Sequence, residues 1–132
     1  MTIGRDDTAR TTKSGVSYFV PKYFEPWDDI YRDGKYIIPY KIHKKLANEH
    51  RAEVALNTAF EKLESKSSLK FIEHTDEKRY LFFTDGYGCH SSVGQQKKLG
   101  AQDITLGPGC YYHFTVIHEV SFLFRLSLSF FR

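Results

Sequence analysis

The most constraining feature of this sequence is a long amphipathic stretch enclosed by two segments of strand character. Residues 43–65 place apolar side chains at close to helical spacing and charged or amide side chains on the other face, which predicts an α-helix. The apolar positions are Leu46, Val54, Leu56, Ala59, Phe60 and Leu63. Residues 35–42 and 69–73 are rich in β-branched and aromatic side chains, so both are predicted strands. Because parallel strands need a connection of helix length, we expect these two strands to pair in parallel.

Shorter elements complete the pattern. Pro39 lies inside the first predicted strand and has no backbone N–H, which favours an edge or a strand end. Further strands are predicted at residues 80–84 and 102–106. A second helix is expected to open over residues 115–119, with Thr115 as an early capping residue. One strand, a long helix, several short strands and a second helix together predict an α+β fold.

The two ends of the chain differ from this middle part. Residues 1–33 are predicted to be a flexible lead-in or the remnant of a propeptide, and they contain no apolar stretch of signal-peptide type. In the tail, residues 120–132, apolar side chains alternate with Arg and Ser from Phe124 to Phe130, which is the period of a strand and not of a helix. This tail is therefore expected to continue the preceding helix poorly and to expose apolar surface.

Charge and hydropathy exclude two classes of partner. The net charge of +3 comes from scattered lysines, whereas a nucleic-acid interface normally shows a dense basic stripe. No apolar stretch reaches the length of a membrane span, and the apolar tail carries two arginines. We therefore expect no nucleic-acid partner and no membrane partner, and the sequence leaves the oligomeric state open.

The two cysteines, Cys89 and Cys110, leave the redox state open. Two cysteines are compatible with one disulfide in an oxidising compartment or with two thiols in a reducing one. Residue chemistry alone does not choose between these alternatives.

The sharpest chemical signal is the dipeptide His118-Glu119. In zinc peptidases, H-E-x-x-H places two imidazoles one helical turn apart on one metal, and the Glu acts as general base on the zinc-bound water. Four residues after His118 this chain has Phe122, so only half of the motif is present. The remaining histidines do not match the spacing and are interpreted as surface or partly buried side chains: His43, His50, His74, His90 and His113.

Several ordered blocks around this dipeptide carry more information than the dipeptide itself. They are residues 38–40 (IPY), 82–86 (FFTDG), 88–94 (GCHSSVG), 100–106 (GAQDITL) and 109–119 (GCYYHFTVIHE). With these blocks the chain resembles the astacin family of zinc metalloendopeptidases over roughly residues 34–119, most of the family's N-terminal subdomain. The resemblance implies a zincin-like α+β subdomain: a twisted mixed sheet, a long backing helix and the start of the zinc-binding helix.

The resemblance also implies roles for particular residues. His118 matches the first ligand of the single catalytic Zn²⁺, and Glu119 matches the general base. Cys89 and Cys110 match a disulfide pair. Residues 102–106 match the edge strand on which family members bind extended peptide by main-chain pairing; they are Gln102, Asp103, Ile104, Thr105 and Leu106. Peptide or protein substrates and secretion from the cell follow as expectations.

The sequence also departs from the family pattern. The second and third His ligands and the C-terminal subdomain are missing, and Phe114 stands where the family commonly has Gly. One imidazole cannot hold catalytic zinc with useful affinity, so we expect a truncated zinc metalloendopeptidase without peptidase activity. Two alternatives stay open: a non-catalytic peptide-binding module that uses strand 102–106, and a small basic binding domain, against which the ordered motifs argue.

The tail after Glu119 suggests its own explanation. Residues 120–132 (VSFLFRLSLSFFR) consist mostly of Phe, Leu and Ser, whose codons are mostly pyrimidine-rich. We interpret this tail as a translated intron that does not belong to the family. A spliced transcript that continues past the Glu119 codon with two further His codons would support this interpretation, and a message that ends at Arg132 would contradict it.

Overall fold

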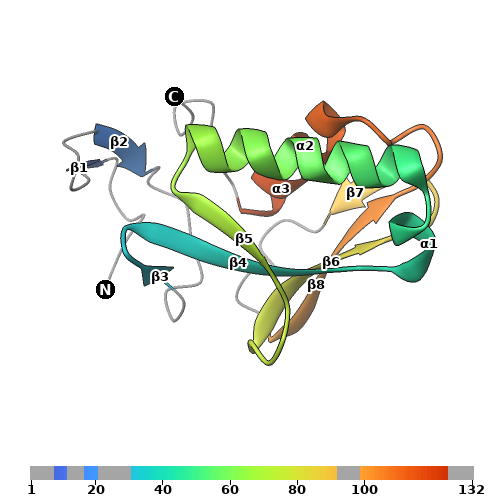
Figure 1. Ribbon diagram of the computed structural model, residues 1–132, viewed down its shortest axis with the longest axis horizontal. Helices are drawn as coiled ribbons and strands as arrows, with labels where there is room; N and C mark the ends of the chain where they lie inside the picture. The colour runs from blue at the N-terminus through green and yellow to red at the C-terminus, as the bar shows by residue number, and fades with distance from the viewer. Residues whose placement is uncertain (1–7, 12–16, 21–30, 92–98, 125–132) are drawn as a thin grey trace.

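The computed structural model describes residues 8–11, 17–20, 31–91 and 99–124 (Figure 1). In chain order the elements are β1 (Thr8–Thr11), β2 (Ser17–Val20), β3 (Tyr31–Arg32), β4 (Lys35–Ile42), α1 (Lys44–Ala47), α2 (His50–Lys66), β5 (Leu69–Glu73), β6 (Arg79–Thr84), β7 (Cys89–Ser91), β8 (Gly100–Leu106) and α3 (His113–Leu123). No helix of these described residues is long and apolar enough to cross a membrane.

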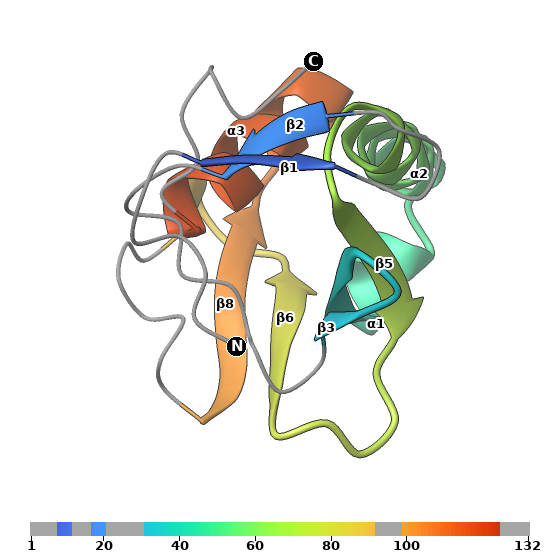
Figure 2. The ribbon, with the colours of Figure 1, turned by 90° about the vertical axis from the view of Figure 1, so that its left-hand side faces the viewer.

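The main sheet has six strands and is mixed. Its order is β3-β4-β6-β8-β7, with β5 on the other side of β4. β4 pairs in parallel with both β5 and β6, and β6 pairs in parallel with β8. The short strands β3 and β7 run antiparallel to their neighbours. Helices α2 and α3 lie over the same face of this sheet (Figures 1 and 2), so the predicted α+β fold with a long backing helix is confirmed.

β4 is an interior strand, which corrects the expected edge position of Pro39. The parallel β4–β5 pair joined by α2 is confirmed, with Pro39 opposite Ile72 of β5. On its other side β4 pairs with β3 only as far as Tyr36, and its pairing with β6 begins at Tyr40. Pro39 therefore falls in a gap between two partners, where its missing N–H costs no ladder hydrogen bond.

The predicted helix 43–65 is divided into α1 and α2. The His43 Nδ1 atom accepts a hydrogen bond from the Lys45 N–H at 3.1 Å and caps α1. The Glu49 carboxylate accepts from the Arg51 N–H at 3.3 Å and caps α2. His43 and Glu49 lie six residues apart, and each caps the N-terminus of a helix. Two separate helices therefore form where one was predicted. The prediction that Val54 belongs to the buried face is wrong, because this side chain is 48% exposed.

Aromatic rings connect α2 to the sheet. Phe60 of α2 stacks on Phe71 of β5, with ring centroids 4.5 Å apart. The same ring lies 4.7 Å from Tyr40 of β4 and 5.7 Å from Phe83 of β6. One side chain thus packs against three adjacent strands, which fixes α2 over the parallel part of the sheet.

Helix α3 begins earlier and ends later than predicted. It starts at His113 with Tyr112 as N-cap, so the prediction that Thr115 caps it is wrong. It continues through Leu123, so the expectation that the tail would not extend the helix is wrong for residues 120–123. Val120, Leu123 and Phe124 have no exposed surface. They stand at i+4, i+7 and i+8 from Val116, which brings them to the same buried face as Val116. Residues 125–132 lie outside the described part of the chain.

The predicted lead-in, residues 1–33, contains regular structure. β1 and β2 pair antiparallel in a separate two-stranded sheet, with Thr8 opposite Val20. These eight residues thus have regular secondary structure, and the expectation of a flexible lead-in or propeptide remnant stays a prediction. The segments 1–7, 12–16 and 21–30 lie outside the described residues.

Candidate metal centre

His118 lies on the exposed face of α3 beside a phenyl ring. The ring of Phe122, one turn further along the helix, is stacked against the imidazole with centroids 6.1 Å apart and an interplanar angle of 18°. Phe122 is 48% exposed. The i, i+4 position that carries the second imidazole of an H-E-x-x-H motif is therefore occupied by a side chain with no ligand atom.

Glu119 points in a different direction from His118. Successive residues of an α-helix are about 100° apart, so neighbouring side chains face different surroundings. Glu119 is 5% exposed and faces β7. The Ser91 hydroxyl donates to it, with Oγ 2.9 Å from the Glu119 Oε1 and 3.0 Å from its main-chain oxygen. This hydrogen bond joins the last residue of β7 to the helix and directs the carboxylate inward.

The donor groups present do not fit a catalytic zinc. Such a site takes three protein ligands and keeps a fourth position for water. Within residues 31–91 and 99–124, as in the rest of the described chain, no group of three or more His, Cys, Asp or Glu side chains could hold a metal ion. One turn after His118, the helix has Phe122, whose side chain cannot bind a metal. In the described part of the chain, the residues around His118 therefore do not fit the catalytic zinc that the sequence resemblance implies.

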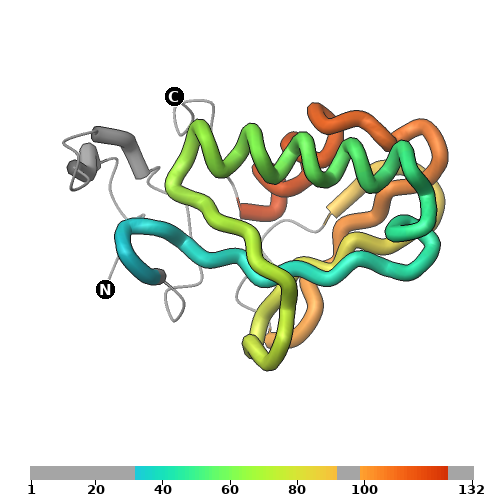
Figure 3. Tube along the Cα trace, in the orientation of Figure 1, coloured from blue at the N-terminus to red at the C-terminus, as the bar shows by residue number. Residues whose placement is uncertain are grey.

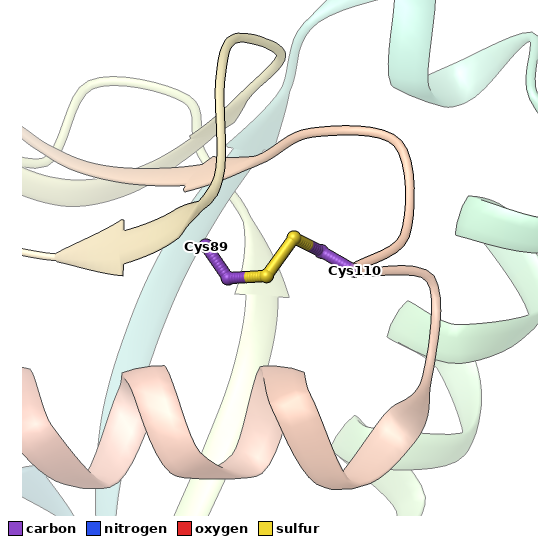
Figure 4. Close-up of a disulfide and its surroundings, with 2 residues drawn as sticks. All are labelled: Cys89 and Cys110. Atoms are coloured by element: carbon purple, nitrogen blue, oxygen red, sulfur yellow. A yellow bond between two sulfur atoms is a disulfide. The ribbon is translucent and has the colours of Figure 1, made fainter.

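A disulfide ties β7 to the segment that leads into α3. Cys89 and Cys110 are bonded, with Cα atoms 5.8 Å apart (Figure 4). Cys89 begins β7, whereas Cys110 is 2% exposed and lies three residues before the start of α3. Of the two redox states that the sequence left open, the structure contains the disulfide.

Removing this disulfide is expected to destabilise the fold. The bond closes a loop of 21 residues, and closure of such a loop contributes about 3 kcal/mol in the chain-entropy account. The variant Cys89→Ser/Cys110→Ser should therefore lose about that free energy of unfolding in urea titrations. The reduced unmodified chain is the matched control and should show the same loss. A loss below about 0.5 kcal/mol in both would contradict this role of the bond.

The strand expected to form the sheet edge is not the edge. β7 pairs outside β8, with Cys89 opposite Leu106 and Ser91 opposite Ile104. β8 therefore lies between β6 and β7 over residues 104–106, and its alternate side chains Gln102, Ile104 and Leu106 are buried. The sequence missed β7 because three residues are too short for a strand pattern. The block 88–94, which carries part of the family resemblance, contains both β7 and Ser91. This block was the signal in the sequence that could have pointed to them.

Comparison with known proteins decides the family. Residues 28–126 match the sequence model described as Astacin, a peptidase family, and this match covers well over half of the chain. This chain belongs to the astacin family. The match ends at residue 126, inside the tail that was expected to leave the family after Glu119.

Individual astacin-family proteins show the same relationship. The chain is 33% identical over 85 residues to zinc metalloproteinase nas-6 of Caenorhabditis elegans, covering 64% of this chain and 23% of that protein. It is 35% identical over 83 residues to meprin A subunit alpha of Mus musculus, covering 63% of this chain and 11% of that protein. The chain thus spans less than a quarter of the length of these relatives.

A solved structure has the same fold. High choriolytic enzyme 1, a hatching enzyme zinc-protease from Oryzias latipes, superposes with a TM-score of 0.62 at 21% identity. The match covers 77% of this chain and 48% of that one. Zinc metalloproteases are therefore the relatives of this chain, and its fold is the one found in an astacin-type enzyme.

Proposed function

We propose that this polypeptide is an astacin-family member that does not complete a catalytic zinc site by itself and therefore does not hydrolyse peptide bonds. The observation that carries the proposal is Phe122, which stacks on His118 at the position of the second ligand. Phe122 lies inside α3, so the argument does not depend on where the chain ends. In a family member with the full ligand set, the chemistry is hydrolysis of peptide bonds by a zinc-activated water.

Within this proposal His118 and Glu119 keep the positions of the first zinc ligand and the general base. The Glu119 carboxylate is buried beside β7 and accepts a hydrogen bond from Ser91.

Activity assays test the proposal directly. Purified protein of this sequence, supplied with zinc, is expected to hydrolyse a casein-type substrate no faster than buffer, because one imidazole does not retain the metal. The Glu119→Ala variant should give the same rate as the unmodified chain. Hydrolysis that requires zinc and disappears in Glu119→Ala would contradict the proposal.

A second candidate function, binding of extended peptide without cleavage, is favoured by the difference between the two edges of the sheet. At the β5 edge, the Glu64 carboxylate accepts a hydrogen bond from the Phe71 N–H at 2.8 Å and so occupies a main-chain donor. At the other edge, no described strand lies outside β7. An open edge offers main-chain groups to an extended peptide, whereas a covered one does not. We therefore assign peptide pairing to β7 and not to residues 102–106.

Main-chain pairing can be tested on the peptide. A fluorescent strand-forming peptide should bind the unmodified chain in zinc-free buffer, and its analogue with alternate N-methylated amides should bind about tenfold or more weakly, because lost main-chain hydrogen bonds are not replaced. Glu64→Ala, at the opposite edge, should leave the affinity unchanged. Equal affinity of the two peptides would exclude pairing along β7.

The disulfide supports an extracellular location for the protein. Disulfides persist in oxidising compartments and are rare where thiols are kept reduced. The Cys89–Cys110 bond closes a structural loop and is not part of a redox motif. We therefore propose that the protein functions after secretion.

A further inference from the structure

A histidine lies at the edge of the sheet where the parallel strands β4 and β6 both end. Ile42 of β4 is opposite Phe83 of β6, and α1 follows β4 at this edge (Figure 3). The histidine is His43, and its N–H donates to the Phe83 carbonyl oxygen at 2.8 Å, which fixes its main chain. Neither α3 nor β7 contributes to this arrangement, so it is separate from the site described above.

The His43 imidazole has two partners at one nitrogen. Its Nδ1 atom accepts the hydrogen bond from the Lys45 N–H that caps α1, at 3.1 Å. The Asp85 Oδ1 atom lies 3.5 Å from the same Nδ1 atom. A ring nitrogen accepts a hydrogen bond only while it carries no proton, and it donates to a carboxylate only when it carries one. The two interactions therefore exclude each other, and the protonation state of the ring decides which one forms.

The groups around this ring act on the choice in opposite directions. Asp85, which follows β6, favours a charged imidazole, whereas the Lys45 ammonium opposes it. The Lys45 Nζ atom lies 3.6 Å from the Asp85 Oδ2 atom, so a charged ring would share the carboxylate with it. β6 faces the imidazole with the Phe82 ring, 6.1 Å between centroids. The neighbouring charged residues of β4 and α1, Lys41 and Lys44, are exposed.

Helix α1 is short enough to depend on its cap. It covers only Lys44–Ala47 and buries Leu46. Two of its main-chain hydrogen bonds run from the Ala47 N–H to the His43 oxygen and from the Asn48 N–H to the Lys44 oxygen, both at 3.0 Å. A single helical turn gains little from cooperative hydrogen bonding, so a capping interaction is a large part of what holds it.

We propose that His43 is a pH-sensitive switch for α1. While the ring is uncharged, its Nδ1 atom caps the helix. Imidazoles take up a proton from water between about pH 8 and about pH 5. With a proton on Nδ1, the ring releases the Lys45 N–H and donates to Asp85, so α1 loosens. Because Leu46 and Ala47 of α1 line a cavity of about 420 Å³, acid pH changes one wall of that cavity.

Hydrogen exchange of the full chain, followed by NMR, tests the proposal at the Ala47 and Asn48 amides. Their protection, relative to an unstructured peptide at the same pH, should fall about fivefold or more between about pH 8 and about pH 5, because a lost cap has about that effect. The ¹⁵N signals of the His43 ring should show no proton on Nδ1 at the upper pH and a proton on both nitrogens at the lower pH.

Substitutions separate the switch from a general effect of acid. His43→Asn keeps a side chain that caps helices and does not titrate, so protection should stay high over the whole range. His43→Ala should give low protection throughout. Asp85→Asn should move the change to lower pH, because the charged ring loses its partner. His50→Asn is the matched control, since His50 lies 3.9 Å from the Glu53 carboxylate within α2 and should leave the behaviour of α1 unchanged.

Three results would overturn the proposal. The first is constant protection of Ala47 and Asn48 over the pH range in the unmodified chain. The second is an equal loss of protection in His43→Asn, which would place the effect of acid on another group. The third is a change at the same pH in Asp85→Asn, which would remove the carboxylate from the switch.

Discussion

Replacing Phe124 by alanine is expected to lower the free energy of unfolding by about 3–5 kcal/mol. Phe124 follows directly after α3 and has no exposed surface, so its removal leaves a cavity in the core. The result is informative because Phe124 belongs to the tail that the sequence pattern placed outside the fold. Urea unfolding of the unmodified chain and of the variant measures the difference.

Phe122→Ala is the matched control. The same residue type, two positions earlier on the chain, is 48% exposed, and substitutions on the surface usually change stability by less than about 0.5 kcal/mol. A similar small effect for Phe124→Ala would show that residues 120–124 do not pack into the core, and the described end of α3 would then be incorrect.

Replacing Phe122 by histidine is expected to raise zinc affinity by about 100-fold. Structural zinc sites with four ligands bind with about 10–16 kcal/mol, which is about 3 kcal/mol for each ligand and about two orders of magnitude in affinity. The Phe122 ring already lies beside the His118 imidazole, 6.1 Å between centroids, so the new imidazole starts near a position from which both can reach one metal. Competition with a zinc-binding dye measures the change.

Two controls separate chelation from simple loss of the phenyl ring. Phe122→Gln removes the ring without adding an imidazole and should leave zinc affinity at the level of the unmodified chain. Phe122→His combined with His118→Ala should return to that level as well. If Phe122→His binds zinc no better than Phe122→Gln, then α3 does not present its i, i+4 side chains as described.

The crossover from β4 through α2 to β5 could be predicted because strand and helix periods are unambiguous there. The boundary between α1 and α2 could not, because it depends on two caps: His43 and Glu49 are not residues that usually signal a helix start. The end of α3 was missed because two hydropathy periods overlap there. Alternation from Phe124 onward indicated a strand, whereas Val120 and Leu123 already fit the helical face of Val116.

The site was predicted in its residue types better than in its geometry. Cys89 and Cys110 form the pair that the family resemblance implied. The family resemblance placed the edge strand on residues 102–106, and β7 was missed because its three residues are too few to show a strand pattern. Ser91 was not singled out, since its contact with Glu119 joins residues 28 positions apart in the sequence. The interpretation of residues 120–132 as translated intron stays a prediction.

Equilibrium dialysis of the unmodified chain against zinc, with His118→Ala as the reference, tests the central claim most directly. The claim is that His118 has, within the described residues, no complete set of metal ligands around it, because Phe122 is stacked on it at the i, i+4 position of α3. We predict substoichiometric zinc after washing and no difference between the two proteins. One tightly held zinc ion per chain, lost in His118→Ala, would contradict the account.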